Sequence, residues 1–252
     1  MKKQPLRPAL LVLGTALREL RTTQGMGLRV LARRLGISAA DLSAWELGMR
    51  RPPAEAAALI LGYLRAKPAE YRQLMQLHGQ SDRSSYVEDL GPNVTDLQHV
   101  YEKQAVRVSE WAPHILPEVL QTAEYRQAIL SDGEVELDDI DQEIFERQVG
   151  ELDRPQGYRH VVLVSEAAWP TSSCLPHTDK VTIRVVPTNA CTSEASHGFT
   201  IYELVSSTFT VVLRHEHAVI YLGETGTVER YRATFARLQR KALDHTLFRI
   251  SR

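Results

Sequence analysis

The residues with the clearest chemistry lie in GISAADLSAWELGMRRPP, residues 36–53. This stretch combines a glycine turn, a short helical segment and a basic exit loop with Arg50 and Arg51, which is the arrangement of a DNA-reading unit. Its helical segment offers Ser43 and alanine methyl groups but no arginine, lysine or glutamine. A hydroxyl group can hydrogen-bond base edges, and a methyl group can pack on the thymine methyl. The chemistry expected is DNA contact with modest direct readout and with affinity drawn from phosphates.

Metal chemistry is a second candidate, because Cys174 and Cys191 each have a histidine a few residues further on. Structural zinc sites usually combine Cys-x2-4-Cys and His-x3-5-His pairs, and neither spacing occurs here. His215 and His217 would share one face of a strand, but the sequence names no third ligand. We therefore expect no metal and no cofactor.

Catalytic motifs are also missing from the sequence. It contains no Gly-rich phosphate loop, no G-x-S-x-G elbow and no HExxH element. The carboxylates of VELDDIDQE are too dense for a poised acid–base pair and are typical of a solvated helix face. We expect no enzyme, although a catalytic site scattered along the sequence, in an enzyme with a vestigial DNA-binding domain, stays an alternative.

The elements that must position residues 36–53 are five consecutive helices, expected over residues 9–79. Gly36 stands where the end of the second helix needs left-handed backbone. Ser38, with Asp41 three residues on, is a shortened capping box that starts the third helix. Leu42 and Trp45 give this third helix a buried side. A helix, a tight turn and a second helix fixed by apolar residues form the helix-turn-helix pattern, with a helical interaction module as the alternative.

Domain boundaries follow from the polar stretch HGQSDRSSYVEDLGPN, which is rich in turn residues. We expect a helix-turn-helix domain over residues 1–80, a linker over residues 81–93 and a second domain over residues 94–252. The fold class predicted is multidomain, with an all-α five-helix domain followed by an α+β domain that has a mainly antiparallel sheet.

The second domain is predicted to begin with helices over 94–112 and 117–130 and around DDIDQEIFERQVGEL. Five segments rich in Val, Ile, Tyr, Phe and Thr then predict strands. These segments are YRHVVLVSE, KVTIRVVPT, GFTIYELV, FTVVLRHE and AVIYLG. A last helix is expected over residues 226–245, with Leu243 on its apolar side.

Charge is divided unevenly between the two parts. Residues 1–80 carry 13 lysines and arginines against 5 aspartates and glutamates, a balance of +8, and the remainder carries −9. This predicts that the first part alone faces a polyanion, unless the segregation arose by chance. Two cysteines are too few for a disulfide framework, and no apolar run is long enough to cross a bilayer. We therefore expect a cytoplasmic protein without membrane contact.

Residues 10–79 resemble the helix-turn-helix domain of the xenobiotic-response-element (XRE, Cro/repressor-like) family of transcriptional regulators. The likeness is carried by LARRLGIS and by the E-x-G-x-R-R-P run from Glu46 to Pro52. The chain departs from the family at Gly27-Leu28, where Ser/Thr-Gln is common, and at Ala44, where arginine or lysine is frequent. Both departures remove polar contacts.

This resemblance implies that the helix from Ser38 to Leu47 enters the major groove of double-stranded DNA and that the protein binds as a homodimer. The residues that would face bases are Ser38, Ala39, Ala40, Ser43 and Ala44. The residues that would contact phosphates are Arg29, Arg33, Arg34, Arg50 and Arg51. For Arg50 and Arg51, a solvated loop is the alternative.

From Val100 onwards the chain resembles the C-terminal domain of antitoxin-like transcriptional regulators of actinobacteria. The matching positions are Tyr101, Glu102, Ala105, Leu120, Gln121, Thr122 and Tyr125, followed by Arg147, Gln148 and Leu152. The chain departs at Glu118-Val119 and in the segment 166–180, which is shortened and lacks an expected helix. The resemblance implies a regulatory role in partnership with a small protein, often encoded nearby.

Candidate partner or ligand residues under this resemblance are Leu120, Gln121, Thr122, Tyr125, Arg147 and Gln148, although Gln121 and Thr122 could instead cap the helix that carries Tyr125. The function expected is a sequence-specific DNA-binding transcriptional regulator whose second domain serves dimerisation or partner or ligand sensing. The first alternative is an antitoxin-like interaction module that binds a small protein and contacts DNA weakly.

Overall fold

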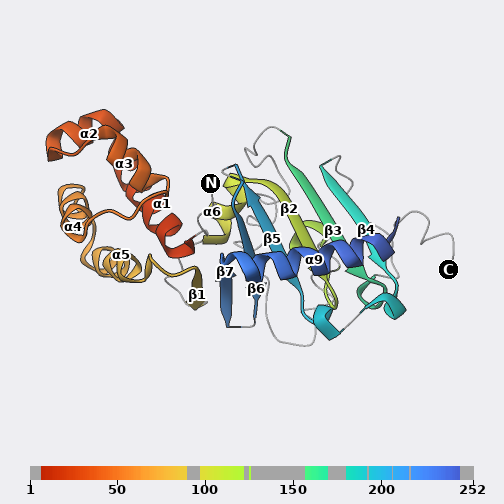
Figure 1. Cartoon of the computed structure of the whole chain (residues 1–252). Helices are drawn as coiled ribbons and strands as arrows, with labels where there is room; N and C mark the ends of the chain where they lie inside the picture. The colour runs from red at the N-terminus through yellow and green to blue at the C-terminus, as the bar shows by residue number, and fades with distance from the viewer. Residues whose placement is uncertain are drawn as a thin grey trace. The chain divides into compact units, whose positions relative to one another are not determined.

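A computed structural model of the chain describes residues 7–89, 97–121, 125, 157–169, 180–191, 193–205, 207–215 and 217–244. The chain divides into two units, residues 1–100 with 215–225 and residues 101–214 with 226–252. We describe each unit separately (Figure 1). Within the described ranges, no helix is long and apolar enough to cross a membrane.

Five helices build most of the first unit, as the sequence predicted. They are α1 (Pro8–Thr23), α2 (Leu28–Leu35), α3 (Ala39–Glu46), α4 (Ala54–Tyr63) and α5 (Pro68–Gln80). Gly36 ends α2 in the left-handed conformation, with φ of 66°. The Ser38 hydroxyl caps α3 by accepting a hydrogen bond from the Asp41 backbone N–H at 3.4 Å. The local signals for the turn and the cap are therefore confirmed.

The contact between α1 and α3 is close enough to involve the main chain. A Cβ atom added to Gly14 in α1 would lie 2.4 Å from the carbonyl oxygen of Trp45 and 2.9 Å from the Gly48 nitrogen. Gly48 follows α3 with φ of 64°, and a Cβ there would lie 2.9 Å from the Leu11 Cα. Two glycines thus let the backbone of α1 meet the end of α3, around a core that includes the fully buried Leu17 and Leu42.

The first unit also contains a two-stranded antiparallel pair that joins distant parts of the sequence. Strand β1 (Ser85–Asp89) pairs with β7 (Ala218–Leu222), and Tyr86 lies opposite Tyr221. The predicted linker at 81–93 did not include this strand. Its buried inward residue is Glu88, which accepts a hydrogen bond from the Tyr221 hydroxyl at 3.0 Å, so the segment lacks the usual apolar alternation.

The second unit is built around a mixed sheet whose strand order is β6-β5-β2-β3-β4-β8. The pairings β2–β3 and β3–β4 are parallel, whereas β2–β5, β5–β6 and β4–β8 are antiparallel. The strands are β2 (Ala105–Ala112), β3 (Arg159–Ser165), β4 (Val181–Val186), β5 (Phe199–Leu204), β6 (Phe209–Arg214) and β8 (Leu243–Asp244). Mostly antiparallel pairing is confirmed, within a mixed sheet.

Side chains cover both faces of this sheet. Helix α9 (Thr225–Lys241) lies across the strands (Figure 1), with the Tyr231 and Phe199 rings 5.0 Å apart. Since residues alternate between faces, Val162 and Val164 point away from α9. They pack with Leu116 and Leu120 from the segment that follows β2.

The structure can be compared with three of the helices predicted for the second domain. The helix expected over 94–112 is confirmed over α6 (Leu97–Gln104) and wrong over residues 105–112, which form β2 and pair with a strand on each side. The helix expected over 226–245 ends at Lys241, and the exposed Leu243 lies in β8. Over 117–130 the structure has the short 3-10 helix η1 (Glu118–Leu120) and a helical Tyr125, and the rest lies outside the described residues, as does the acidic helix.

Replacing Gly14 with alanine should destabilise the first unit, because the added methyl group would force α3 away from α1. Overpacking of this kind lowers the free energy of unfolding by about 1–3 kcal/mol. The matched control is Gly62→Ala in α4, where no atom lies within 4 Å of the added Cβ. Alanine should leave stability unchanged or raise it by up to about 1 kcal/mol there. Urea unfolding of the full-length protein measures both, and equal stability of the two variants would contradict the close contact.

Candidate nucleic-acid interface

Helix α3 presents one accessible face and one buried face. At 100° per residue, Ala39, Ala40, Ser43 and Ala44 fall on one side of the helix, and none of them is buried. Ser38 is exposed at the cap. Leu42 and Trp45 on the opposite side are buried, and so is Glu46 at the edge of the accessible face, next to Ala39. The five residues predicted to face bases are therefore all accessible from solvent.

Two exposed apolar residues extend this accessible face, and the sequence analysis did not single them out. Leu47, directly after α3, lies three residues beyond Ala44 on the same side, and 47% of it is exposed. Met49 in the exit loop is 66% exposed. Continuing the helical period past Ala44 would have identified Leu47, whereas the position of Met49 depends on the loop.

The basic residues of α2 differ in how they are held. Arg29 and Arg33, one helical turn apart, are exposed, and neither has a hydrogen bond or an ion pair among the described residues. Arg34 instead donates a hydrogen bond to the Tyr63 hydroxyl of α4 at 3.0 Å. Two of the three predicted phosphate contacts on this helix, Arg29 and Arg33, therefore have no hydrogen-bond or ion-pair partner in the described part of the chain.

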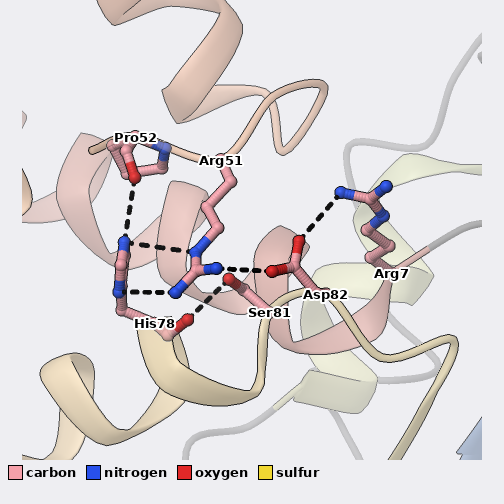
Figure 2. Close-up of polar contacts among 6 residues, drawn as sticks. All are labelled: Arg7, Arg51, Pro52, His78, Ser81 and Asp82. Carbon is pink, nitrogen blue, oxygen red and sulfur yellow. Dashed lines mark hydrogen bonds and ion pairs between the residues drawn. The ribbon is translucent and has the colours of Figure 1, made fainter. Parts of the chain in front are cut away.

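Arg50 and Arg51 follow α3 but have different surroundings. Arg50 forms an ion pair with Asp41 in the first turn of α3, and both side chains are largely exposed, at 58% and 41%. Such exposed pairs contribute about 0–1 kcal/mol, so Arg50 can exchange Asp41 for a phosphate. Arg51 contacts His78 and Asp82 near the end of α5, and Asp82 also accepts a hydrogen bond from Arg7 at 3.2 Å (Figure 2).

A buried ion pair between Arg21 and Glu46 fixes α3 at the edge of its accessible face. Arg21 in α1 donates from Nε and Nη2 to the two carboxylate oxygens of Glu46, at 2.7 Å each. The third guanidinium nitrogen, Nη1, donates to the Met26 carbonyl oxygen at 2.7 Å. Hydrogen bonding to Glu46 raises the pKa of Arg21, against the opposing effect of burial. Glu46 of the E-x-G-x-R-R-P run therefore positions α3.

The candidate partner residues of the second unit are mostly enclosed. Leu120 is fully buried, and Gln121 Nε2 donates to the Leu116 carbonyl oxygen at 2.6 Å. The Leu116 N–H donates to the Tyr125 hydroxyl at 3.0 Å. These contacts hold residues 116–121 and Tyr125 together beside the core. The other three candidates, Thr122, Arg147 and Gln148, lie outside the described residues.

Other residues noted in the sequence are placed as follows. Tyr101 is buried, and burial raises the pKa of its hydroxyl, which accepts a hydrogen bond from Thr210. His215 and His217 are both exposed. Within the part of the chain that is described, no three His, Cys, Asp or Glu side chains are grouped as metal ligands would be.

Two protein families match this chain. The helix-turn-helix domain family matches residues 12–74, which include α2, α3 and the turn between them. A domain of unknown function (DUF5753) matches residues 96–170 and 175–247. Curated proteins yield no match.

Three solved structures are similar to parts of the chain. The clp gene regulator ClgR from C. glutamicum has 31% identity and a TM-score of 0.25, over 32% of this chain and 99% of that one. Nuc, a phospholipase D family member from Salmonella typhimurium, has 7% identity and a TM-score of 0.33, over 64% and 97%. TrmBL2, an archaeal chromatin protein, has 11% identity and a TM-score of 0.32, over 75% and 66%. With TM-scores this low, none of the three likenesses carries an argument.

Removing one partner of the buried ion pair should lower the free energy of unfolding far more than removing one partner of an exposed pair. Glu46→Gln leaves the Arg21 charge buried without its counterion, and we expect a loss of about 3–5 kcal/mol in the free energy of unfolding. The matched control is Glu229→Gln, which removes the exposed pair with Arg232 and should change stability by less than about 1 kcal/mol.

A double replacement, Arg21→Met with Glu46→Leu, tests the same pair in another way. It removes both charges and should destabilise less than Glu46→Gln alone. Equilibrium unfolding of the full-length variants in urea measures all three. Similar losses for Glu46→Gln and Glu229→Gln would show that the pair does not fix α3.

Proposed function

The chain belongs to the family of proteins with the domain of unknown function DUF5753, and because it also carries a helix-turn-helix domain, we propose that it is a sequence-specific DNA-binding transcriptional regulator. The observation that carries this proposal is the surface around α3. An accessible face free of large polar side chains is flanked in the sequence by Arg29 and Arg33, which have no counterion in the described part of the chain, and by the weakly held Arg50.

In the proposed complex, α3 enters the major groove and the arginines contact the phosphates on either side. Ser43 hydrogen-bonds base edges, while Ala40 and Ala44 pack against thymine methyl groups, an apolar surface that Leu47 extends. Without a bidentate arginine–guanine or glutamine–adenine pair on α3, each worth about 1–3 kcal/mol, binding depends mainly on phosphate contacts.

The finer parts of the proposal concern type, assembly and partners. The LARRLGIS and E-x-G-x-R-R-P sequences favour an XRE-type (Cro/repressor-like) regulator that binds as a homodimer. Its two recognition helices would enter successive major grooves about 34 Å apart. The resemblance of the second domain to antitoxin-like actinobacterial regulators favours a role in dimerisation or in binding a small protein partner.

The salt dependence of DNA binding tests the assignment of the phosphate contacts. The slope of log K against log salt is negative, and each lost phosphate contact reduces its magnitude by about 0.9. The double variant Arg29→Ala with Arg33→Ala should therefore reduce this magnitude by about 2 per protomer. The control is Arg72→Ala, an exposed residue of α5, the helix that packs against α1 and α4. We expect the slope of this control to equal that of the wild type.

The ligand for this measurement is duplex DNA selected from genomic fragments by the purified full-length protein at moderate salt. If no fragment is retained, the proposed function is wrong. If fragments are retained but the double variant keeps the wild-type slope, the regulator stands and the two arginines are not its phosphate contacts.

A further inference from the structure

Arg51 differs from the other cations near α3 because its guanidinium contacts side chains of another part of the unit. Only 34% of its side chain is exposed, compared with 58% for the adjacent Arg50. Its guanidinium lies beside the His78 ring and forms an ion pair with Asp82 (Figure 2). Both partners come from the end of α5 and the residues just after it, so Arg51 joins the exit loop of α3 to a different helix.

The hydrogen bonds of His78 set the roles of its two ring nitrogens. Its Nε2 lies 2.9 Å from the Pro52 carbonyl oxygen, which can only accept, so Nε2 donates there, and Arg51 Nε, 3.4 Å from the same atom, lies beside it without donating to it. The Nδ1 atom, 3.3 Å from Arg51 Nη2, then accepts from the guanidinium through its lone pair. His78 therefore holds the side chain of Arg51 and the main chain of Pro52 at once.

The positions of both partners are themselves restrained. His78 is 5% exposed, and its carbonyl oxygen accepts a hydrogen bond from the buried Ser81 hydroxyl at 2.7 Å. Asp82 accepts hydrogen bonds from Arg51 and from Arg7, the residue that precedes α1. The charge of Arg51 is therefore already compensated by a carboxylate, and a contact with DNA phosphate would have to replace these interactions.

We propose that Arg51 is a positioning residue, which fixes the exit loop of α3 to α5 and so sets how α3 is presented to DNA, without itself contacting a phosphate. The proposal rests on the DNA-binding function proposed above. It divides the two adjacent arginines by role: Arg50 faces solvent and binds phosphate, whereas Arg51 acts through His78 and Asp82.

Lysine substitution distinguishes the two roles, because lysine keeps the charge but lacks the planar fork. A phosphate contact tolerates lysine as a point charge, whereas a fork between His78 and Asp82 does not. With the selected duplex DNA and the full-length protein, we expect Arg51→Lys to lose roughly tenfold in affinity, with an unchanged salt slope. The control, Arg72→Lys at an exposed residue of α5 outside the proposed interface, should keep wild-type affinity.

Substitution of His78 tests the same arrangement while leaving Arg51 and Asp82 in place. We expect His78→Leu, which removes the donor to Pro52 and the acceptor for Arg51, to lower affinity by roughly tenfold with the salt slope unchanged. We expect His78→Gln, whose amide can donate to the Pro52 carbonyl and accept from Arg51, to restore most of the binding. If His78→Leu fails to fold, the comparison of Arg51→Lys with Arg72→Lys decides.

Amide hydrogen exchange over residues 48–51 of the free protein follows the loop without DNA. We expect faster exchange in Arg51→Lys and His78→Leu, and wild-type exchange in Arg72→Lys. Unchanged exchange in all three variants would overturn the positioning role. So would wild-type affinity of Arg51→Lys together with a salt slope whose magnitude is reduced by about 0.9 in Arg51→Ala. If the wild type retains no DNA while exchange responds as expected, the proposed function fails and the restraint on the loop stands.

Discussion

The arrangement of the first unit depends on the buried ion pair between Arg21 and Glu46. Its bidentate geometry, with a third hydrogen bond to the Met26 carbonyl, joins α3 to the end of α1 and to the loop that leads into α2. A buried ion pair contributes less to net stability than to specificity of packing, since both charges lose solvation, but leaving either charge alone is strongly unfavourable. The pair therefore selects one rotation of α3, with Leu42 and Trp45 inside and the alanine face outside.

This constraint changes how the E-x-G-x-R-R-P run is understood. Its Glu46 is a buried partner of Arg21, its Gly48 allows the main chain to pass close to Leu11, and its Arg51 joins the loop to α5. Of the charged residues in the run, Arg50 is the one held only by an exposed ion pair. A sequence pattern that resembles a DNA-binding signature thus describes mainly the packing that orients the helix.

Much of the first unit could be predicted from local signals, because a glycine cap at Gly36 and a hydroxyl cap at Ser38 act over a few residues. The partners of Arg21 and Arg51 could not be, since Glu46 is 25 residues away from Arg21 and Asp82 is 31 residues away from Arg51. The accessible face of α3 followed from helical periodicity. Which nearby cations have a protein counterion depends on tertiary contacts that no local pattern contains.

The second unit shows the same limit in its sheet. Strands β3 to β6, like β7 of the first unit, are predicted because their apolar and β-branched residues are continuous enough to identify. Over β2 the sequence predicts a helix, and AVRVSEWA mixes a serine, an arginine and a glutamate with its apolar residues. Its conformation is decided by pairing with β3 on one side and β5 on the other. The two-residue β8 is too short to have a sequence signal of its own.

The unequal roles of the arginines bear on how a helix lined with alanine can discriminate among DNA sequences. With Arg51 committed to His78 and Asp82, the cations left for phosphates lie on α2 and at Arg50, around a face that offers few hydrogen bonds to bases. Phosphate contacts follow the path of the backbone, and that path depends on sequence through groove width and bending. Specificity in the proposed complex therefore has to come from DNA shape and from the fixed spacing of two subunits. Both require a rigidly oriented α3. The ion pair of Glu46 and the contacts of Arg51, at the two ends of the E-x-G-x-R-R-P run, supply this rigidity.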